Sequence, residues 1–191
     1  MSTNLQSILS PISADMQSLN DVIRSRLSSE VALINQISAY IIEAGGKRIR
    51  PALLLLTSQA ISNGTPLKHH LDMAAVVDFI HTATLLHDDV VDESAVRRSM
   101  FSINALWKNK IAVLVGDYML SRVLLLAVES GDHDLLKIVS TAVRAMSEGE
   151  LLQIEKARRL DIDESVYYDI IQKKTASLMA SCCAVGAASV G

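Results

Sequence analysis

The 191-residue chain has little of what builds disulfide-stapled or β-rich domains. It contains two cysteines and three prolines, and only 4% of its residues are aromatic. Cys182 and Cys183 are adjacent and lack metal-ligand spacing, so we expect them to be reduced packing residues of a cytoplasmic protein. No run of residues predicts a β-strand. These absences leave a helical fold as the expectation.

Positive charge is also limited. The formal net charge is −3, and no Lys/Arg cluster interleaves with aromatic residues, so nucleic acid is not expected as a partner. Residues 1–10 lack the basic start and apolar run of a signal peptide. The longest apolar stretch, residues 111–128, contains Asp117 and Arg122. We therefore expect a buried helix there and no membrane span.

Aliphatic residues, by contrast, are abundant and recur at helical spacing. Gly45–Gly46 end one helix, Pro51 can open the next, and Thr65–Pro66 read as the start of a long one. The pattern predicts helices over residues 19–27, 31–44, 51–63, 66–92, 103–130 with a break near Lys110, 133–156, and from Asp163 onward.

These helices predict one all-α domain over residues 1–191, an antiparallel helix bundle. Residues 176–191 carry no charge and read as a buried helix. The chain stops there without a polar tail, so we expect a truncated sequence with further helices to follow.

The most informative segment is acidic. Asp88 and Asp92 are four residues apart, which places both carboxylates on one helical face, and Asp89 and Glu93 repeat the spacing. Like charges at this spacing repel by about 0.2–0.5 kcal/mol even when exposed. A hard divalent cation such as Mg²⁺, which prefers oxygen ligands and takes further ones from phosphates, would relieve the repulsion.

A solvated acidic helix end is the alternative reading of this segment. Three features favour a metal site instead. The preceding residues are largely apolar, and two arginines follow within a few residues. On an ideal helical wheel one stripe also joins Asp78, His81, Leu85, Asp88 and Asp92. His81 alone would more often be a core histidine, and its place on this stripe makes ligand binding an equal alternative.

Three basic clusters accompany the aspartates: residues 45–51 (GGKRIRP), Arg97–Arg98 and residues 173–175 (KKT). Glycines let backbone approach a ligand, and a helix start favours anions. Each cluster alone is more often surface charge, but together with the aspartates they predict a site for two polyphosphates. The polar breaks Gly116–Asp117 and Glu148–Glu150 are given packing and helix-end roles by default.

Taken together, five segments resemble the trans-isoprenyl diphosphate synthases. They are GGKRIRP at 45–51, LLHDDVVDESAVRR at 85–98, VGDYML at 115–120, EGELLQ at 148–153 and KTASL at 174–178. Each is weak alone, but their order and spacing are specific. The resemblance covers about residues 40–186. It implies an Mg²⁺-dependent prenyltransferase that condenses isopentenyl diphosphate with an allylic diphosphate, acts as a homodimer and serves quinone side chains.

The resemblance also implies residue roles. Asp88 and Asp92, supported by Asp89, match the metal-binding motif that holds the allylic diphosphate, and with Lys174 they are the catalytic candidates. The residues that match isopentenyl diphosphate ligands are Lys47, Arg50, His81 and Arg98. Those that match positions near the allylic diphosphate are Arg97, Lys174 and Thr175. The family's second Asp-rich motif is absent, so we expect little turnover from this chain.

Two rival functions stay open. A class I terpene cyclase also uses an Asp-rich motif, but it has no second diphosphate for GGKRIRP to hold. A non-catalytic subunit of a hetero-oligomeric synthase fits the missing second motif, although Asp88, Asp92, Lys47 and Arg50 are intact. A later Asp-rich motif in the complete reading frame would favour the enzyme.

Product length is the last expectation from the resemblance. In the family, bulky residues four or five positions before the first Asp block the tunnel for the growing chain. Here these positions are Thr84 and Ala83, both small. They imply an open tunnel and a product of about octaprenyl length.

Overall fold

The structure, a computed structural model, describes residues 5–63 and 69–190. Within them the chain is helical, as the apolar spacing predicts. The helices are α1 (Leu5–Leu9), η1 (Ser10–Ile12), α2 (Ser13–Leu27), α3 (Ala32–Ala44), α4 (Ile49–Ser62), α5 (His70–Val91), α6 (Ile103–Trp107), α7 (Asn109–Glu129), α8 (His133–Arg159), α9 (Glu164–Ile171), η2 (Gln172–Ala176) and α10 (Ser177–Ala188).

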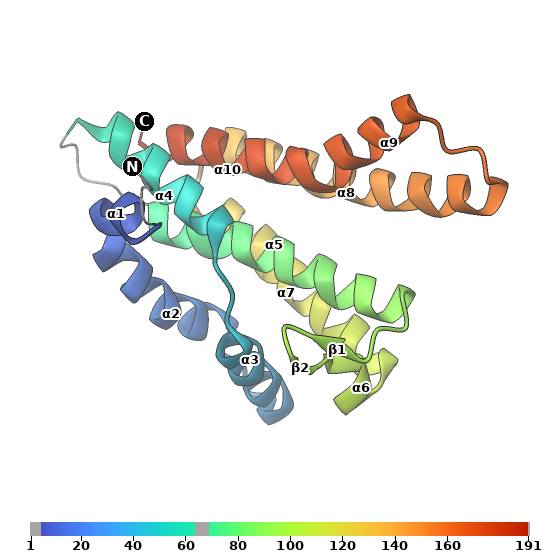
Figure 1. Ribbon diagram of the computed structural model, residues 1–191. Helices are drawn as coiled ribbons and strands as arrows, with labels where there is room; N and C mark the ends of the chain where they lie inside the picture. Colours follow the sequence, from blue (N-terminus) through green and yellow to red (C-terminus); the bar gives the residue numbers. More distant parts are fainter. Residues whose placement is uncertain (1–4, 64–68, 191) are drawn as a thin grey trace.

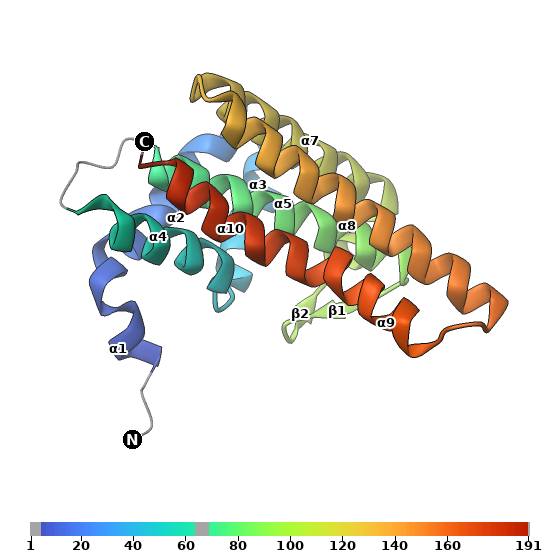
Figure 2. The same cartoon turned by 90° about the horizontal axis from the view of Figure 1, so that it is seen from above.

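Helix α5 is the centre of the bundle. Its residues 73–77, with Phe79, Ile80 and Ala83, are at most 1% exposed. A helix that is apolar on most of its faces must be covered on most of them. Helices α2, α4, α7 and α10 surround it (Figures 1 and 2). The core therefore lies along α5, and the polar end of α5 is carried to one end of the bundle.

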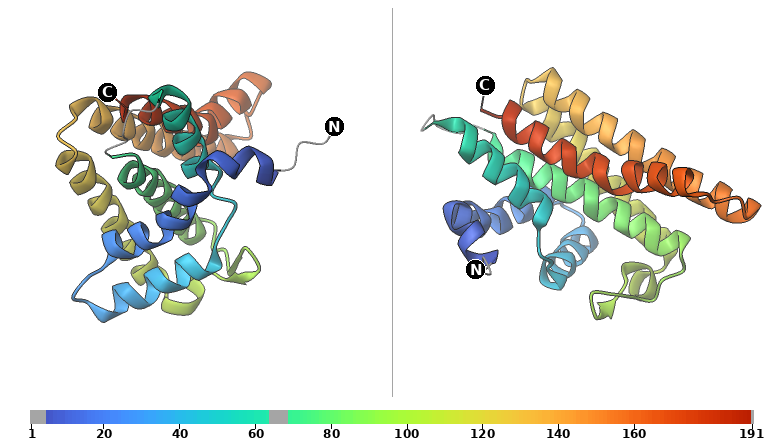
Figure 3. Two further views of the ribbon diagram at one scale, coloured as in Figure 1. Left: turned by 90° about the vertical axis from the view of Figure 1, so that its left-hand side faces the viewer. Right: turned by 45° about the horizontal axis from the view of Figure 1, so that its top comes forward.

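The long helices alternate in direction. Figures 2 and 3 show α7 running back along α5, α8 returning, and α9–α10 running back again, which confirms the predicted antiparallel bundle. Helix α10 is packed closely on α4, because a Cβ at Gly186 would lie 2.5 Å from the Leu54 carbonyl oxygen. Leu178, Cys182 and Val185 are fully buried there. The uncharged segment after residue 176 is thus a core helix, as expected.

Two helices begin where the sequence predicts, each with an aspartate as its N-cap. The Asp132 carboxylate accepts from the backbone N–H of Asp134, and that of Asp163 from Val166, each at 2.8 Å. The start of α5 differs: the helix begins at His70, and Thr65–Pro66 lie outside the described residues. The predicted break near Lys110 occurs at Lys108, where φ is 77°.

Three expectations about local structure are wrong. Residues after α5 form a short antiparallel hairpin, β1 (Val96–Arg97) with β2 (Met100–Phe101), where no strand was predicted. Two-residue strands are too short to leave an alternating pattern. The breaks assigned to Gly116–Asp117 and Glu148–Glu150 do not exist, because α7 and α8 pass through them. Neighbouring side chains explain both glycines: a Cβ at Gly116 would meet the His87 ring, and one at Gly149 would meet Lys173.

Candidate functional site

The loop between α3 and α4 is shaped by its glycines. Gly45 has a φ of 60° and Gly46 a φ of 152°, conformations that side chains disfavour. A Cβ at Gly46 would lie 2.7 Å from the Cζ atom of Arg98, so the bare backbone makes room for that guanidinium. Two of the predicted basic clusters, distant in sequence, therefore meet at this loop.

Arg50 and His81 form the second contact of this region. Arg50 Nη1 lies 2.9 Å from His81 Nε2. Burial, and then the charge of Arg50, lower the pKa of His81 to about 4. The ring is therefore neutral near pH 7, and its Nε2 accepts the hydrogen bond from Arg50. Burial also lowers the pKa of Arg50, whose Nε is buried without a hydrogen-bond partner in the described structure.

A cavity of about 210 Å³ opens beside these groups. Its lining includes the predicted polar residues Lys47, Arg50, His81, Arg97 and Arg98. Helices α2, α3, α5, α6 and α7 contribute apolar lining, which includes Ile23, Leu27, Ile41, Phe79, Leu86, Ile103 and Met119. An unpaired buried donor and several cations beside an apolar wall suit an anionic headgroup on a short apolar chain.

The sequence places Arg48 in a basic cluster and Asp78 on the polar stripe, but it predicts no contact between them. Arg48 Nη1 donates to Asn20 Oδ1 at 2.6 Å, and its Nε lies 3.8 Å from Asp78 Oδ2. Burial raises the pKa of Asp78, while the Arg48 charge lowers it. The pair joins the loop to α2 and α5. A lone carboxylate inside an apolar helix was the available signal, but its partner, 30 residues away, could not be read from local spacing.

The predicted stripe on α5 divides between two surfaces. Asp78, His81 and Leu85 line the cavity, whereas Asp88 and Asp92 do not. Asp92 is the C-cap of α5 and is exposed. Burial raises the pKa of Asp88, and the negative charge of Glu150 on α8 adds to the shift. The single polar face predicted from the wheel is therefore only partly right, because Asp88 faces α8.

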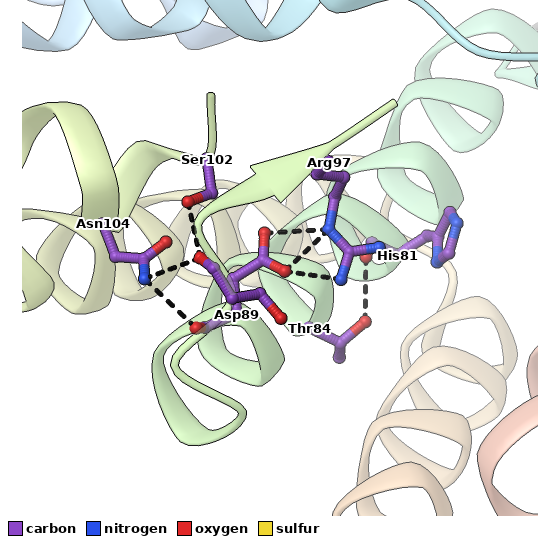
Figure 4. A network of polar contacts seen from close by, with 7 residues as sticks. His81, Thr84, Asp89, Arg97, Ser102 and Asn104 are labelled. Carbon is purple, nitrogen blue, oxygen red and sulfur yellow. Dashed lines mark hydrogen bonds and ion pairs between the residues drawn. The ribbon is translucent and has the colours of Figure 1, made fainter. Parts of the chain in front are cut away.

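Asp89 is turned away from its neighbours toward the hairpin. It is 2% exposed, and Arg97 Nε donates to both of its carboxylate oxygens at 2.8 Å (Figure 4). Asn104 Nδ2 donates to the carbonyl oxygens of Asp89 and Ser94, at 3.2 and 3.0 Å. The structure brings Asp89 to Arg97, and not to Asp88 and Asp92 as the metal prediction required.

Lys174 and Thr175 lie on η2, a single π-helical turn. Such turns often occur at functional sites. Lys174 Nζ donates to Gln153 Oε1 at 3.0 Å and forms an ion pair with Glu150. Thr175 is exposed. Lys174 therefore reaches the same side as Asp88. Glu150 and Gln153, three residues apart on α8, were missed because their motif was given a helix-end role.

The oxygen donors suit Mg²⁺, but only as part of a coordination shell. Among the described residues, no group of three or more His, Cys, Asp or Glu side chains could hold a metal ion. Asp88 and Asp92 supply two carboxylates, and Mg²⁺ takes remaining ligands from water and phosphate. The half-buried Asp88, already destabilised by Glu150, would gain from a cation. The pair thus fits a cation that arrives with a polyphosphate.

The remaining predicted residues occupy the interior. Ala83 is 0% exposed, and Thr84 Oγ1 donates to the His81 carbonyl oxygen at 2.8 Å (Figure 4). Neither lines the cavity, so that cavity is not the predicted tunnel. Burial raises the pKa of Cys182 to about 12, which keeps the thiol neutral, in line with a packing role.

Comparison with known proteins gives one consistent family. A family model described as polyprenyl synthetase matches residues 31–191. Octaprenyl diphosphate synthase of Escherichia coli (strain K12) is 43% identical over 175 residues, which cover 92% of this chain and 54% of that protein. All-trans-nonaprenyl-diphosphate synthase (geranyl-diphosphate specific) of Rhodobacter capsulatus is 43% identical over 173 residues, 91% of this chain and 53% of that protein.

The fold has close relatives among solved structures. The polyprenyl synthase from Caulobacter crescentus CB15, complexed with calcium and isoprenyl diphosphate, has a TM-score of 0.92 at 39% identity. The match covers 100% of this chain and 58% of that one. The chain spans about half the length of the curated relatives it matches.

Proposed function

Because the chain belongs to the polyprenyl synthetase family, we propose that it forms part of an Mg²⁺-dependent prenyltransferase that condenses isopentenyl diphosphate with an allylic diphosphate. One observation carries the proposal. Helix α5 lines a cavity that includes Arg50, whose Nε is buried without a hydrogen-bond partner in the described structure. The same helix carries Asp88 and Asp92 outside that cavity. A cation-lined cavity and a carboxylate pair would bind a diphosphate in different ways, and this suits two diphosphate substrates with different roles.

The cavity side would hold isopentenyl diphosphate. Arg50 and Arg98 would bind its phosphates, and neutral His81 would keep the Arg50 guanidinium in place. Lys47, exposed on the loop, would add a third cation. The apolar wall suits the five-carbon tail, since burial of apolar surface contributes about 25 cal/mol per Å².

The opposite side would hold the allylic diphosphate. Asp88 and Asp92 would bind Mg²⁺, which when bound neutralises charge on the leaving diphosphate. Lys174 and Thr175 would contact the same phosphates. Arg97 would add a further cation near these phosphates; it also lines the cavity, and its Nε and Nη2 donate to Asp89.

The reaction follows from these placements. The allylic carbon–oxygen bond breaks, and its electron pair leaves with the diphosphate, whose charge the cationic groups stabilise. The double bond of isopentenyl diphosphate supplies the electrons of the new carbon–carbon bond. Loss of a proton then restores a double bond. Apolar helix surfaces would exclude water from the carbocation.

The decisive experiment uses the complete reading frame. The protein that it encodes should incorporate radiolabelled isopentenyl diphosphate into longer prenyl chains. An excess of chelator should abolish the incorporation. Equal incorporation with chelator would contradict the proposal. The 191-residue chain, which spans about half of its relatives, should bind diphosphates but turn over little.

Product length is proposed as octaprenyl or somewhat longer, with quinone side chains as the use. Small residues at positions 83 and 84 support it, as do the octaprenyl and nonaprenyl products in the relatives' names. Ala83→Tyr or Thr84→Phe in the complete protein should shift the products to three or four isoprene units. Chromatography of the dephosphorylated products would decide, and unchanged lengths in both variants would place the tunnel elsewhere.

A homodimer in the cytoplasm is proposed as the working state. By length and composition α7 could cross a membrane, yet one face of this helix packs against α5. Its outer face exposes Leu114, Leu124 and Val128 by 54%, 54% and 63%, and no described segment covers them. Light scattering should give twice the chain mass for the wild type and a monomer for Leu124→Glu. A monomeric wild type would contradict the dimer.

A further inference from the structure

Glu150 is a carboxylate on the metal side that the proposed roles leave unused. Its side chain is 19% exposed and forms an ion pair with Lys174. The Lys174 ammonium also donates to Gln153 Oε1 at 3.0 Å, one turn further along α8. An ammonium group has three N–H donors. The bond to Gln153 uses one of them, so the ammonium keeps N–H donors for a ligand.

The backbone is shaped to make this pair. A Cβ at Gly149 would lie 2.7 Å from Lys173 Cβ and 3.1 Å from the Lys174 backbone nitrogen. Only a residue without a side chain lets η2 lie this close to α8. Lys173 turns to Asp169, 2.6 Å away, and leaves Glu150 to Lys174. The ion pair is thus a built contact between two elements, unlike a chance pairing of surface chains.

The pair also sets the charge that a diphosphate meets. Glu150 and Lys174 act in opposite directions on the Asp88 carboxyl, so both lie near it. The Glu150 carboxylate lies against the Lys174 ammonium and offsets its charge, while Asp88 and Asp92 add two further carboxylates on this side. A bare diphosphate would be repelled at this side. A diphosphate with bound cations would present positive charge to the aspartates and an oxygen to Lys174.

We propose that Glu150 is a specificity-determining residue whose ion pair with Lys174 makes this side of the site reject metal-free diphosphates and accept their magnesium complexes. The inference rests on the proposed function through one step, the assignment of Lys174 to the allylic diphosphate. Glu150 does not touch the reacting atoms; it acts by holding Lys174 and by its charge.

Calorimetric titration with inorganic pyrophosphate tests this on the 191-residue chain, once with excess Mg²⁺ and once with excess EDTA. All variants carry Arg50→Met, so that the cavity side does not mask the signal. Glu150→Gln should tighten metal-free binding about tenfold, which corresponds to about 1.4 kcal/mol. Binding of the magnesium complex should change far less, so the preference for the complex falls.

The matched control is Glu148→Gln. It removes the same charge two residues away on α8, where Glu148 is 54% exposed and pairs only at 3.9 Å with Arg144. It should leave the preference for the magnesium complex unchanged. If Glu150→Gln behaves like Glu148→Gln, the inference is overturned. If Glu150→Gln lowers the melting temperature, Glu150→Met provides a second variant without the charge. Glu150→Asp keeps the charge and should retain the preference for the magnesium complex.

Lys174→Met separates this inference from the proposed function. If it leaves binding of the magnesium complex unchanged, the assignment of Lys174 fails and takes the Glu150 inference with it. If it weakens that binding while Glu150→Gln matches its control, only the role of Glu150 fails. In the Lys174→Met background, Glu150→Gln should lose most of its effect, because the pair no longer exists.

Discussion

The two sides of α5 carry opposite charge. The cavity is lined by five cations, Lys47, Arg48, Arg50, Arg97 and Arg98, and by two carboxylates, Asp78 and Asp89. On the other side Asp88, Asp92 and Glu150 are set against Lys174. Asp89 and Arg97 form a paired, locally neutral contact between the two. The same chemical group, a diphosphate, would meet attraction on one side and repulsion on the other.

On the proposed function, this difference in charge would place the metal on the side of Asp88 and Asp92. A cation-rich cavity can hold a bare diphosphate through charge-assisted hydrogen bonds alone. A carboxylate-rich surface cannot, and needs divalent cations between itself and the phosphates. On the proposed function, the diphosphate that leaves its carbon would gain the metal's charge stabilisation, and the other substrate would be held without it. Four experiments test whether the two sides differ in this way.

Loss of the carboxylate on the metal side should have the largest effect. Asp88→Ala in the complete protein should lower the rate with saturating Mg²⁺ about 1000-fold, because stabilisation of the leaving diphosphate by about 4 kcal/mol is lost. Affinity for isopentenyl diphosphate should change little. Steady-state kinetics with each substrate varied would measure both. Similar losses in both Michaelis constants at an unchanged rate would remove the distinction between the two sides.

The Asp89–Arg97 ion pair between the two sides should contribute to the free energy of unfolding. Asp89→Asn should lower the free energy of unfolding by about 3 kcal/mol, the low end for a broken buried pair, because Arg97 is partly exposed. Urea unfolding of the 191-residue chain measures it. Asp92→Asn, an exposed position on the same segment, is the control and should be close to neutral. A loss of metal binding in Asp89→Asn equal to that in Asp88→Asn would restore Asp89 as a ligand.

Features that depend on residues close together in the sequence could be predicted. Features that depend on contacts between distant segments could not. Apolar spacing predicts most of the helices, and the turn residues before them predict the helix starts near residues 133 and 163, because these depend on residues within one or two turns. The direction of each carboxylate does not follow from a wheel. Asp89 is turned to Arg97 by a hairpin, and Asp88 faces Glu150, 62 residues further on. Pairings between distant elements, such as Gly149 with η2, leave only an unexplained glycine in the sequence.

Loss of the central cation on the cavity side should have a smaller effect than the first two. Arg50→Met should weaken binding of isopentenyl diphosphate about 30-fold, or about 2 kcal/mol, with the same factor in EDTA as in Mg²⁺. Calorimetry on the 191-residue chain measures it, with exposed Lys110→Met as the charge control. An effect confined to Mg²⁺ buffers would mean that the cavity, too, binds a metal complex.

The smallest effect concerns pH and the neutral ring on the cavity side. Burial, then Arg50 and Arg98, lower the pKa of His81 from 6.5 to about 4. Between these values the unfolded chain binds a proton that the folded chain does not, so this contribution to stability is present above pH 6.5 and is lost as pH falls toward 4. From pH 7 to pH 5.5 the loss should be about 1 kcal/mol.

Urea unfolding of the wild type and His81→Asn at both pH values isolates this term, since asparagine keeps an acceptor for Arg50 but cannot be protonated. The wild type should lose about 1 kcal/mol more than the variant between pH 7 and 5.5. Equal losses would mean that folding does not lower the pKa of His81, so that the ring is protonated at pH 5.5 and cannot accept from Arg50 at that pH. In that case the His81 ring would not stay neutral beside its three neighbouring guanidinium groups. It would add a positive charge to the cavity.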